Sequence, residues 1–356
     1  MAIKKIASIV GARPQFIKAA PVSRALASYF KEVLIHTGQH YDYGMSEVFF
    51  TEMEMKPPDF NFGIGGGTHA EQTGKMLIEL EKVFNSVKPD CILVYGDTNS
   101  TLAGALAAAK AQIPLAHVEA GLRSYNRAMP EEINRVLTDH VSELLFCPTD
   151  DAVENLVKEG IVNGIHRVGD VMYDALLYNL KLAHGNSQIL KKLDLKKGEY
   201  ALATVHRAAN TDEKLRLSSI IKAFGSLSSQ VVFPIHPRTR KMMQEWGILV
   251  NSNILLIEPV GHFDMLVLQE NANAILTDSG GVQKEAYLLG VRCITLREET
   301  EWVETVKAGW NRLTGVDVKM IKDTFESWFP ETERLSLYGE GKAAIEMSEI
   351  LRAKLG

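Results

Sequence analysis

The chain has 356 residues, of which 46% are hydrophobic and 23% charged, as expected for a globular protein with room for two domains. Its formal charge is −5 and no run of lysine or arginine offsets this, so we expect no nucleic-acid partner. The N-terminal apolar run is too short for a signal peptide, and no segment is long enough to cross a membrane, which predicts a cytoplasmic protein without a membrane partner.

Short β-rich runs alternate with longer helical ones in the first half, which predicts a doubly wound parallel sheet. The expected strands are Lys5–Val10, Glu32–His36, Asp90–Tyr95, Leu115–Val118 and Glu143–Cys147. The expected helices are Phe16–Ala27, Ser46–Met53, His69–Ser86, Thr101–Ala111, Asp150–Glu159 and one that starts at Pro130. The run DCILVY is apolar throughout, as is typical of a central parallel strand covered on both faces.

The pattern loosens into polar helix and loop over residues 168–196, which we interpret as a linker region, and the alternation then restarts. The second set of expected strands is Tyr200–Val205, Gln230–Ile235, Ile254–Ile257, Ala274–Thr277 and Arg292–Leu296. We therefore predict an α/β protein with two Rossmann-like, doubly wound domains that face a cleft, over residues 1–170 and 171–340. The last segment, 341–356, is expected to be a helix that packs back on the first domain.

One stretch, Leu115 to Arg135, is unusually rich in charge for its position. It opens as the buried strand LAHV and continues into three carboxylates and three guanidiniums: Glu119, Arg123, Arg127, Glu131, Glu132 and Arg135. Pro130 begins a helix there, and acidic residues in a first turn suit the helix dipole. A surface ion-pair network would account for each residue singly, but the end of a parallel strand is where ligands bind in open α/β sheets.

Other strand ends of the first half carry related chemistry. Arg13 and Lys18 lie around the first strand-to-helix turn, where phosphates bind in such folds. Asp97 and Glu119 follow two strands that would be neighbours, so their carboxylates are candidates for general acid and base. Asp97 could instead cap the helix that follows it, or do both.

The strand ends of the second half are rich in histidine, arginine and glycine. Two glycines after Asp278 let the backbone approach an anion at a helix start, and Glu285 lies one turn along, where it could bind ribose hydroxyls. Together these residues offer a cradle for a diphosphate and a sugar. The candidates are His206, Arg207, His236, Ser279, Gly280, Gly281 and Glu285.

Several common sites are not indicated. There is no GxxxxGK[ST] motif, and no dinucleotide fingerprint follows a strand, so no nicotinamide or other cofactor is expected. His36 and His40 have metal-ligand spacing but lack a clear third ligand, so no metal is expected. Cys91 and Cys293 lie in apolar runs and no CxxC pair occurs, which favours buried thiols in a reducing compartment.

Taken in order, the segments GARPQFIK, HTGQH, YGDT, HVEAGLRS, PEEINR, TVHR and TDSGGVQKEA resemble the motifs of non-hydrolysing UDP-N-acetylglucosamine 2-epimerases. The resemblance runs from Gly11 to about Asn311. It implies the GT-B fold, a UDP-sugar substrate, a homodimer and no nicotinamide.

The resemblance also implies roles for single residues. Asp97, Glu119 and Glu131 would be the acid/base carboxylates, with Lys18 and His206 in the active site. The UDP would be held by Arg13, Ser279, Gly280, Gly281 and Glu285.

The sequence departs from the family pattern at several positions. Gln15 and Ala209 stand where the family usually has a glutamate or another carboxylate. Gln39 and His40 remain in the loop where bacterial members bind an activating UDP-sugar, but Asp42 and Lys75 differ, so the motif leaves allosteric activation open.

The usual TERPE segment reads LREETEWVETVKAGWN, which resembles the branch acting on UDP-2,3-diacetamido-2,3-dideoxy-glucuronate. Arg238, Arg240 or Lys241 could then meet a C6 carboxylate. We predict epimerisation at C2 of UDP-GlcNAc by elimination and re-addition of UDP, for polysaccharide precursor synthesis, with the uronate sugar as the alternative. The alternative hypotheses are a GT-B glycosyltransferase, a hydrolysing epimerase and a non-catalytic sensor.

Overall fold

The computed structural model describes residues 3–39 and 55–356 of the chain, which fold into two compact units. Unit 1 comprises Met1–Tyr178 and Leu337–Gly356, and unit 2 comprises Asn179–Ser336. Helix α7 (Val171–Asn186) runs through the first boundary, so the region interpreted as a linker is largely helical. The predicted helix Ser46–Met53 lies outside the described residues.

Unit 1 is built on a parallel sheet with the strand order β3-β2-β1-β4-β5-β6-β7. Its strands are β1 (Lys5–Val10), β2 (Lys31–His36), β3 (Phe60–Asn61), β4 (Cys91–Tyr95), β5 (Leu115–Val118), β6 (Leu144–Cys147) and β7 (Ile165–Arg167). Its other helices are α1 (Arg13–Leu26), α3 (His69–Val87), α4 (Asn99–Lys110), α5 (Pro130–Val141), α6 (Asp150–Lys158) and α16 (Ala343–Leu355).

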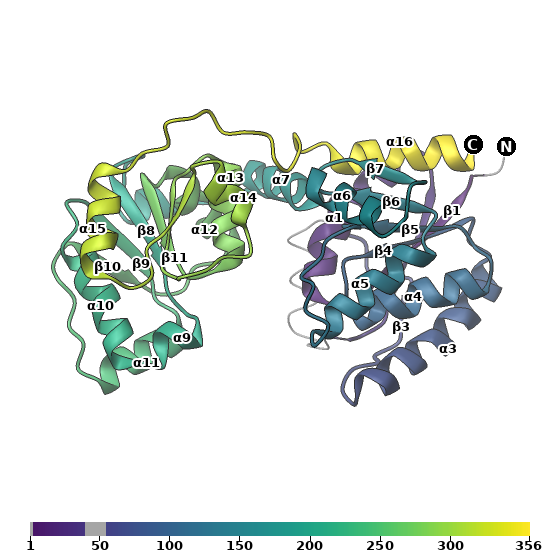
Figure 1. The fold of residues 1–356 in the computed structure, drawn as a ribbon, viewed down its shortest axis with the longest axis horizontal. Coiled ribbons are helices and arrows are strands. Elements are labelled where there is room, and N and C mark those ends of the chain that lie inside the picture. The colour runs from purple at the N-terminus through teal and green to yellow at the C-terminus, as the bar shows by residue number, and fades with distance from the viewer. Residues whose placement is uncertain (1–2, 40–54) are drawn as a thin grey trace. The chain divides into compact units, whose positions relative to one another are not determined.

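Unit 2 has a six-stranded parallel sheet with the equivalent order, β10-β9-β8-β11-β12-β13. Its strands are β8 (Tyr200–Thr204), β9 (Gln230–Pro234), β10 (Ile254–Ile257), β11 (Ala274–Thr277), β12 (Cys293–Thr295) and β13 (Asn311–Leu313). Its helices are α8 (Ile189–Lys192), α9 (Ala208–Thr211), α10 (Lys214–Gly225), α11 (Pro237–Glu245), α12 (His262–Asn271), α13 (Gly280–Leu289), α14 (Val303–Lys307) and α15 (Val318–Ser327). The predicted α/β class with two Rossmann-like, doubly wound domains is confirmed (Figure 1).

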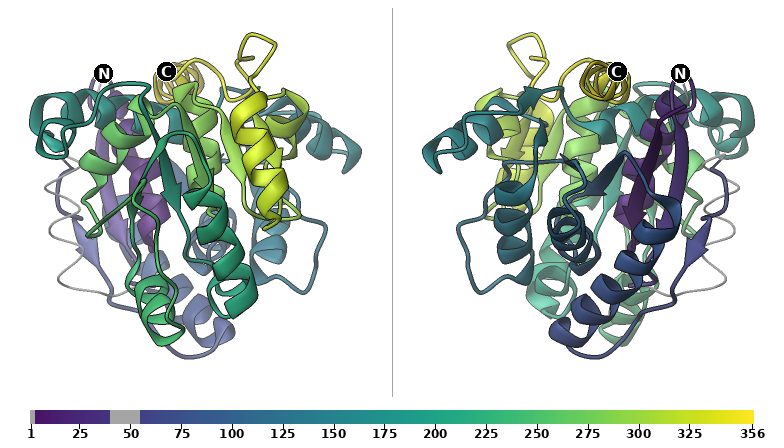
Figure 2. Two further views of the ribbon diagram at one scale, coloured as in Figure 1. Left: turned by 90° about the vertical axis from the view of Figure 1, so that its left-hand side faces the viewer. Right: turned by 90° about the vertical axis from the view of Figure 1, so that its right-hand side faces the viewer.

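Both sheets are covered by helices on both faces, which is why their strands read as continuous apolar runs. In unit 1, Ile6 and Leu93 face the layer of α1 and α16, whereas Ala7 and Ile92 face that of α3 and α4. In unit 2, α10 and α15 pack together over one face (Figure 2, left). The three short strands β3, β7 and β13 escaped sequence analysis because two or three residues are too few to show a period of two.

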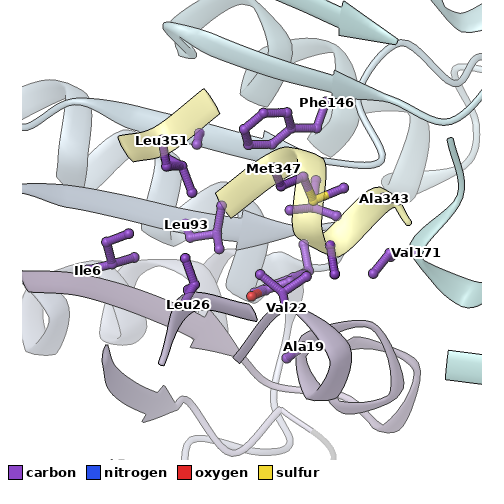
Figure 3. Close-up of a cluster of buried hydrophobic side chains, with 14 of the residues drawn as sticks. Ile6, Ala19, Val22, Leu26, Leu93, Phe146, Val171, Ala343, Met347 and Leu351 are labelled. Atoms are coloured by element: carbon purple, nitrogen blue, oxygen red, sulfur yellow. The ribbon is translucent and has the colours of Figure 1, made fainter. Parts of the chain in front are cut away.

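The C-terminal helix α16 belongs to unit 1, although it follows all of unit 2 in the sequence. Figure 3 shows Met347 and Leu351 among the side chains of this layer, with Leu93 of β4 and Phe146 of β6. The buried side chains of Met347 and Leu351 each contribute about 2 kcal/mol through apolar burial. Asp174 of α7 accepts hydrogen bonds from the backbone N–H groups of Ala343 (3.2 Å) and Ala344 (2.9 Å), so α16 is fixed at its start as well as along its face.

Candidate active site

The strand order reverses between β1 and β4 in unit 1, and between β8 and β11 in unit 2. In open α/β sheets, ligands bind at the carboxyl ends of the strands at such switch points. Arg13 begins α1 directly after the turn that follows β1, and the turns after β4, β8 and β11 contain Asp97, His206 and Ser279. Most of the residues selected from the sequence therefore lie at the two switch points.

The switch point of unit 1 holds an ion pair between Lys18 of α1 and Glu119, the residue after β5. The side chains are 12% and 14% exposed. Burial by itself would lower the pKa of Lys18, but the charge and hydrogen bond of Glu119, with the charges of Asp97 and Asp170, raise it above its usual value. Lys18 therefore stays protonated at neutral pH, and a permanent positive charge lies among three carboxylates.

The backbone around this pair is specialised. Glu119 has a φ of +76°, which is a strained conformation for a residue with a side chain, and such strain is concentrated at functional sites. A Cβ on Gly96 would lie 3.3 Å from the Glu119 carboxylate and 3.4 Å from the Lys18 ammonium. Only glycine leaves this space open at the end of β4.

Asp97 lies beside the pair and is held from α5. Arg135 donates to its carboxylate, and the side-chain amide of Asn134 donates to its backbone oxygen at 2.9 Å. The alternative that Asp97 caps the following helix is wrong, because α4 begins at Asn99 and Thr98 accepts from the N–H of Thr101. The carboxylate of Asp97 is 29% exposed, so it is open to a ligand.

Gln15 explains one departure from the family pattern. Its side-chain oxygen accepts from the N–H groups of Gly11 (2.7 Å) and Ala12 (3.0 Å). Its side-chain nitrogen donates to the carbonyl of Tyr95 at 2.7 Å, so the residue ties the turn after β1 to the end of β4. A carboxylate could accept but not donate, so an amide suits this position. Because this side chain caps the helix, α1 begins at Arg13, three residues before the predicted helix start at Phe16.

Not every predicted residue of unit 1 joins this cluster. Glu131 is exposed in the first turn of α5, and among the described residues no hydrogen bond or ion pair connects it to Lys18, Glu119 or Asp97. Its neighbour Glu132 is buried and accepts from Ser124 and Tyr125. Arg13, the first residue of α1, is exposed to solvent.

Sequence analysis missed Asp170, which follows the short strand β7. It is 3% exposed and accepts from the N–H of Met172 at 2.8 Å, and its charge acts on Lys18. The signal was available, because Gly169–Asp170 repeats the Gly96–Asp97 pair at another strand end. It was overlooked because the three-residue strand before it was not recognised.

The switch point of unit 2 is organised by Asp278, which is fully buried after β11. Its carboxylate accepts from the backbone N–H of His206 (3.1 Å) and of Arg207 (3.0 Å), and from the side chain of Asn210 (3.1 Å). The turn after β8 is thereby fixed, while the ring of His206 remains 42% exposed, 5.8 Å from that of His236.

The start of α13 presents its first backbone N–H groups at this edge of the sheet. Ser279 is its N-cap residue, but its side chain makes no capping bond, so the hydroxyl is not used for that purpose. The first N–H groups of a helix have no partner within it, and together with the dipole of this ten-residue helix they suit the predicted diphosphate. Glu285 lies further along, where it accepts from Gln269 at 2.8 Å and burial raises its pKa.

Glu301 lies across the start of α13. It accepts from Arg297 (2.8 Å) and Arg207 (3.1 Å), and its carboxylate would be 3.2 Å from a Cβ on Gly280. The hydrogen bonds from Arg297 are the largest cause of a lowering of its pKa to about 2. Trp302 donates its indole N–H to the carbonyl of Gly280 at 2.7 Å. The segment that departs from TERPE is thus in direct contact with the predicted diphosphate site.

The described residues were also searched for free cysteines, metal-ligand clusters and membrane-spanning helices. The three cysteines are buried, as predicted for Cys91 and Cys293. No group of three or more potential metal ligands occurs in residues 3–39 and 55–356, and His40 and Asp42 lie outside them. Within the same ranges, no helix combines the length and apolar character needed to cross a bilayer.

Comparison with known proteins extends these findings. The family described as UDP-N-acetylglucosamine 2-epimerase matches residues 24–352. A protein of Methanococcus maripaludis named UDP-N-acetylglucosamine 2-epimerase homolog is 53% identical over 98% of this chain and 99% of its own. The UDP-2,3-diacetamido-2,3-dideoxy-D-glucuronate 2-epimerase of Pseudomonas aeruginosa is 46% identical over 99% of this chain and 100% of its own.

Two solved structures of the UDP-GlcNAc 2-epimerase from Methanocaldococcus jannaschii are also similar. One has a TM-score of 0.89 at 45% identity, and the other, in complex with UDP-GlcNAc and UDP, has a TM-score of 0.77 at 46% identity. Both matches cover 98% of this chain and 99% of the other. With its two Rossmann-like units, the protein has the predicted GT-B fold class. The chain belongs to the UDP-N-acetylglucosamine 2-epimerase family, which confirms the predicted resemblance.

Proposed function

We propose that this protein interconverts UDP-GlcNAc and UDP-ManNAc, acting as a non-hydrolysing 2-epimerase. The observation that carries the proposal is the Lys18–Glu119 ion pair with Asp97 beside it, at the switch point of a sheet in a chain of this family. The complex of the M. jannaschii enzyme with UDP-GlcNAc and UDP supports a UDP-sugar as the substrate.

The diphosphate is assigned to unit 2. The N–H groups at the start of α13, with Ser279 and Arg207, stabilise the negative charge that grows as UDP leaves C1. Glu285 takes the ribose hydroxyls, and His236 and Arg13 complete the predicted binding set. His206 remains a predicted catalytic residue. Glu301 now holds Arg207, so a diphosphate that binds Arg207 competes with that carboxylate.

Proton transfer is assigned to unit 1. The C2 hydrogen of an acetamido sugar is not next to a carbonyl carbon, so it becomes acidic only as positive charge develops at C1. Glu119 and Asp97 then serve as base and acid, giving a 2-acetamidoglucal intermediate to which UDP re-adds. Lys18, protonated throughout, keeps the site from accumulating negative charge. Glu131 remains a predicted third carboxylate, for which the described residues offer no contact to this cluster.

The mechanism is tested by running the reaction in heavy water. We expect solvent deuterium at C2 of the product, with a small leak of free UDP and glycal. A product that keeps its original C2 hydrogen would contradict the mechanism. Incubation with UDP-GlcNAc alone also separates the rival functions, because a glycosyltransferase needs an acceptor, a hydrolysing epimerase releases the free sugar, and a sensor leaves its ligand unchanged.

A second candidate substrate is the 2,3-diacetamido uronate sugar. It is favoured by the position of Trp302 against Gly280 in the segment that departs from the family pattern, and by the similarity to the P. aeruginosa enzyme. Arg238 and Arg240, considered for the C6 carboxylate, are paired with Asp212 and Glu258. Comparing kcat/KM for the two UDP-sugars shows which of them is the preferred substrate. Faster turnover of UDP-GlcNAc would exclude a preference for the uronate sugar. A homodimer remains a prediction from the family resemblance, and a cytoplasmic location remains a prediction from the sequence.

A further inference from the structure

His117, on β5, is fully buried and makes two short hydrogen bonds. Its Nε2 lies 2.7 Å from the carbonyl oxygen of Gly96, and its Nδ1 lies 2.6 Å from the carboxylate of Asp139. Gly96 comes directly before Asp97, in the turn that ends β4. The ring therefore reaches from one strand to the turn that carries a predicted catalytic carboxylate on the next.

Asp139 passes the connection on to a second turn. Its other oxygen accepts from the N–H of Gly121 (3.1 Å), two residues after Glu119, and from Arg123 (2.7 Å). Arg123 is in turn held by two hydrogen bonds of 2.7 Å to Glu159. One buried network thus contacts the backbone of Gly96, directly before Asp97, and includes His117 and Gly121, which lie two residues before and two residues after Glu119.

The partners fix the protonation of the ring. A carbonyl oxygen can only accept, so Nε2 of His117 donates to Gly96. His117 and, after it, Arg123 hold the pKa of Asp139 below its usual value despite its burial, so Asp139 is a carboxylate that accepts from Nδ1.

The turn at Gly96 depends on this contact more than an ordinary turn would. Gly96 has a φ of +62°, and its N–H donates to the carbonyl of Val118 at 3.0 Å, so residues of β5 hold both sides of the glycine. Asn134 holds the next carbonyl from α5. A shift of the turn would move Asp97 and would close the space that Gly96 leaves for the Lys18–Glu119 pair.

We propose that His117 is a positioning residue for the epimerase reaction: its hydrogen bond to Gly96 sets the turn that carries Asp97 against the Lys18–Glu119 pair. The expected effect of His117 on the reaction rate rests on the proposed function. The claim that His117 fixes the turn at Gly96 rests only on the geometry of unit 1. A misplacement of reacting groups by about 1 Å can cost as much as a hundredfold in rate, so a measurable effect is expected.

Two substitutions of nearly equal size separate the two bonds of the ring. In His117→Gln, the amide nitrogen reaches the position of Nε2 and keeps the donor to Gly96. In His117→Asn, it occupies the position of Nδ1 and keeps the donor to Asp139 but does not reach Gly96. We expect His117→Asn to lower kcat by about tenfold or more with KM changed less than twofold, and His117→Gln to stay within about threefold of the original kcat.

For both variants we also measure the melting temperature and the rate of amide hydrogen exchange at residues 95–98. Faster exchange there in His117→Asn than in His117→Gln supports the proposal, and equal exchange in the two variants contradicts it. Equal kcat in the two folded variants, whether retained or lost, would overturn it too. If His117→Asn does not fold, His117→Gln alone tests the proposal. A tenfold loss of kcat in folded His117→Gln would contradict it. An original enzyme that is inactive on every UDP-sugar refutes the proposed function instead, and the exchange measurement still decides the positioning claim.

Discussion

The two switch points of this protein have the same strand order and opposite chemistry. In unit 1, a lysine and carboxylates lie close together and largely buried, at the end of β4 and β5. In unit 2, the exposed side chains of His206 and Arg207 lie at the same edge of the sheet as the start of α13, where Ser279 makes no capping bond. The equivalent strand order gives each unit one candidate ligand position, and we infer that the side chains decide whether that position serves proton transfer or anion binding.

Two aspartates show the difference most sharply. Asp97 follows β4 and Asp278 follows β11, so they occupy similar points of the two sheets. Asp97 keeps 29% of its side chain exposed and pairs with Arg135, whereas Asp278 is fully buried and accepts from backbone N–H groups. We infer that Asp97 serves the reaction and that Asp278 serves the fold of its turn.

The largest effect is expected from Asp97→Asn. It should lower kcat by about a hundredfold or more, the usual scale for losing a positioned acid or base, with UDP affinity and melting temperature nearly unchanged. Glu119→Gln should lower kcat on the same scale, and because it leaves the buried Lys18 ammonium without its partner it should also lower the melting temperature. Asp90→Asn is the matched control, because Asp90 precedes β4 at the opposite end of the same strand. An Asp97→Asn enzyme with full kcat would remove the distinction between the two aspartates.

Asp278→Ala should act on stability instead. It leaves the N–H groups of His206 and Arg207 and the amide of Asn210 without their acceptor, so we expect a loss of about 2 to 3 kcal/mol in the free energy of unfolding. Chemical denaturation measures it. An unchanged unfolding free energy, together with a large loss of kcat in the folded variant, would assign Asp278 to the reaction.

A smaller effect concerns Asp174, a buried carboxylate of unit 1. Burial is the largest cause that raises the pKa of Asp174 to about 6. The folded state thus binds this proton more tightly than the unfolded chain does, so its contribution to stability is complete below pH 4 and is lost as the pH rises through 6. Asparagine cannot ionise, so Asp174→Asn should gain about 2 kcal/mol relative to the original protein between pH 4 and pH 7.

Unfolding free energies at pH 4, 5, 6 and 7 check this prediction for both proteins. The sign is opposite to that of an acid stabilised by a salt bridge. A difference between the two proteins that stays constant over this range would show that Asp174 ionises as easily in the folded state as in the unfolded chain.

Much of the site could be predicted because strand ends are visible in the sequence. Apolar runs such as DCILVY end at a defined residue, so Asp97, Glu119 and Ser279 were found without a structure. Asp170 was missed because a strand of three residues leaves no pattern. His117 was interpreted only as part of an apolar strand, because the segment LAHV alone does not indicate that its ring contacts the carbonyl of Gly96 at the end of the neighbouring strand.

The sequence by itself determined the α/β class, the two repeats of alternating strands and helices, and the residue types at the strand ends, because periodicity and composition are local properties. Tertiary structure decided what each of those residues does. Thr98 rather than Asp97 caps α4, Asp278 turns inward while Asp97 does not, and Gln15 joins two strand ends. Burial and hydrogen-bond partners come from segments distant in the chain, so no local pattern specifies them.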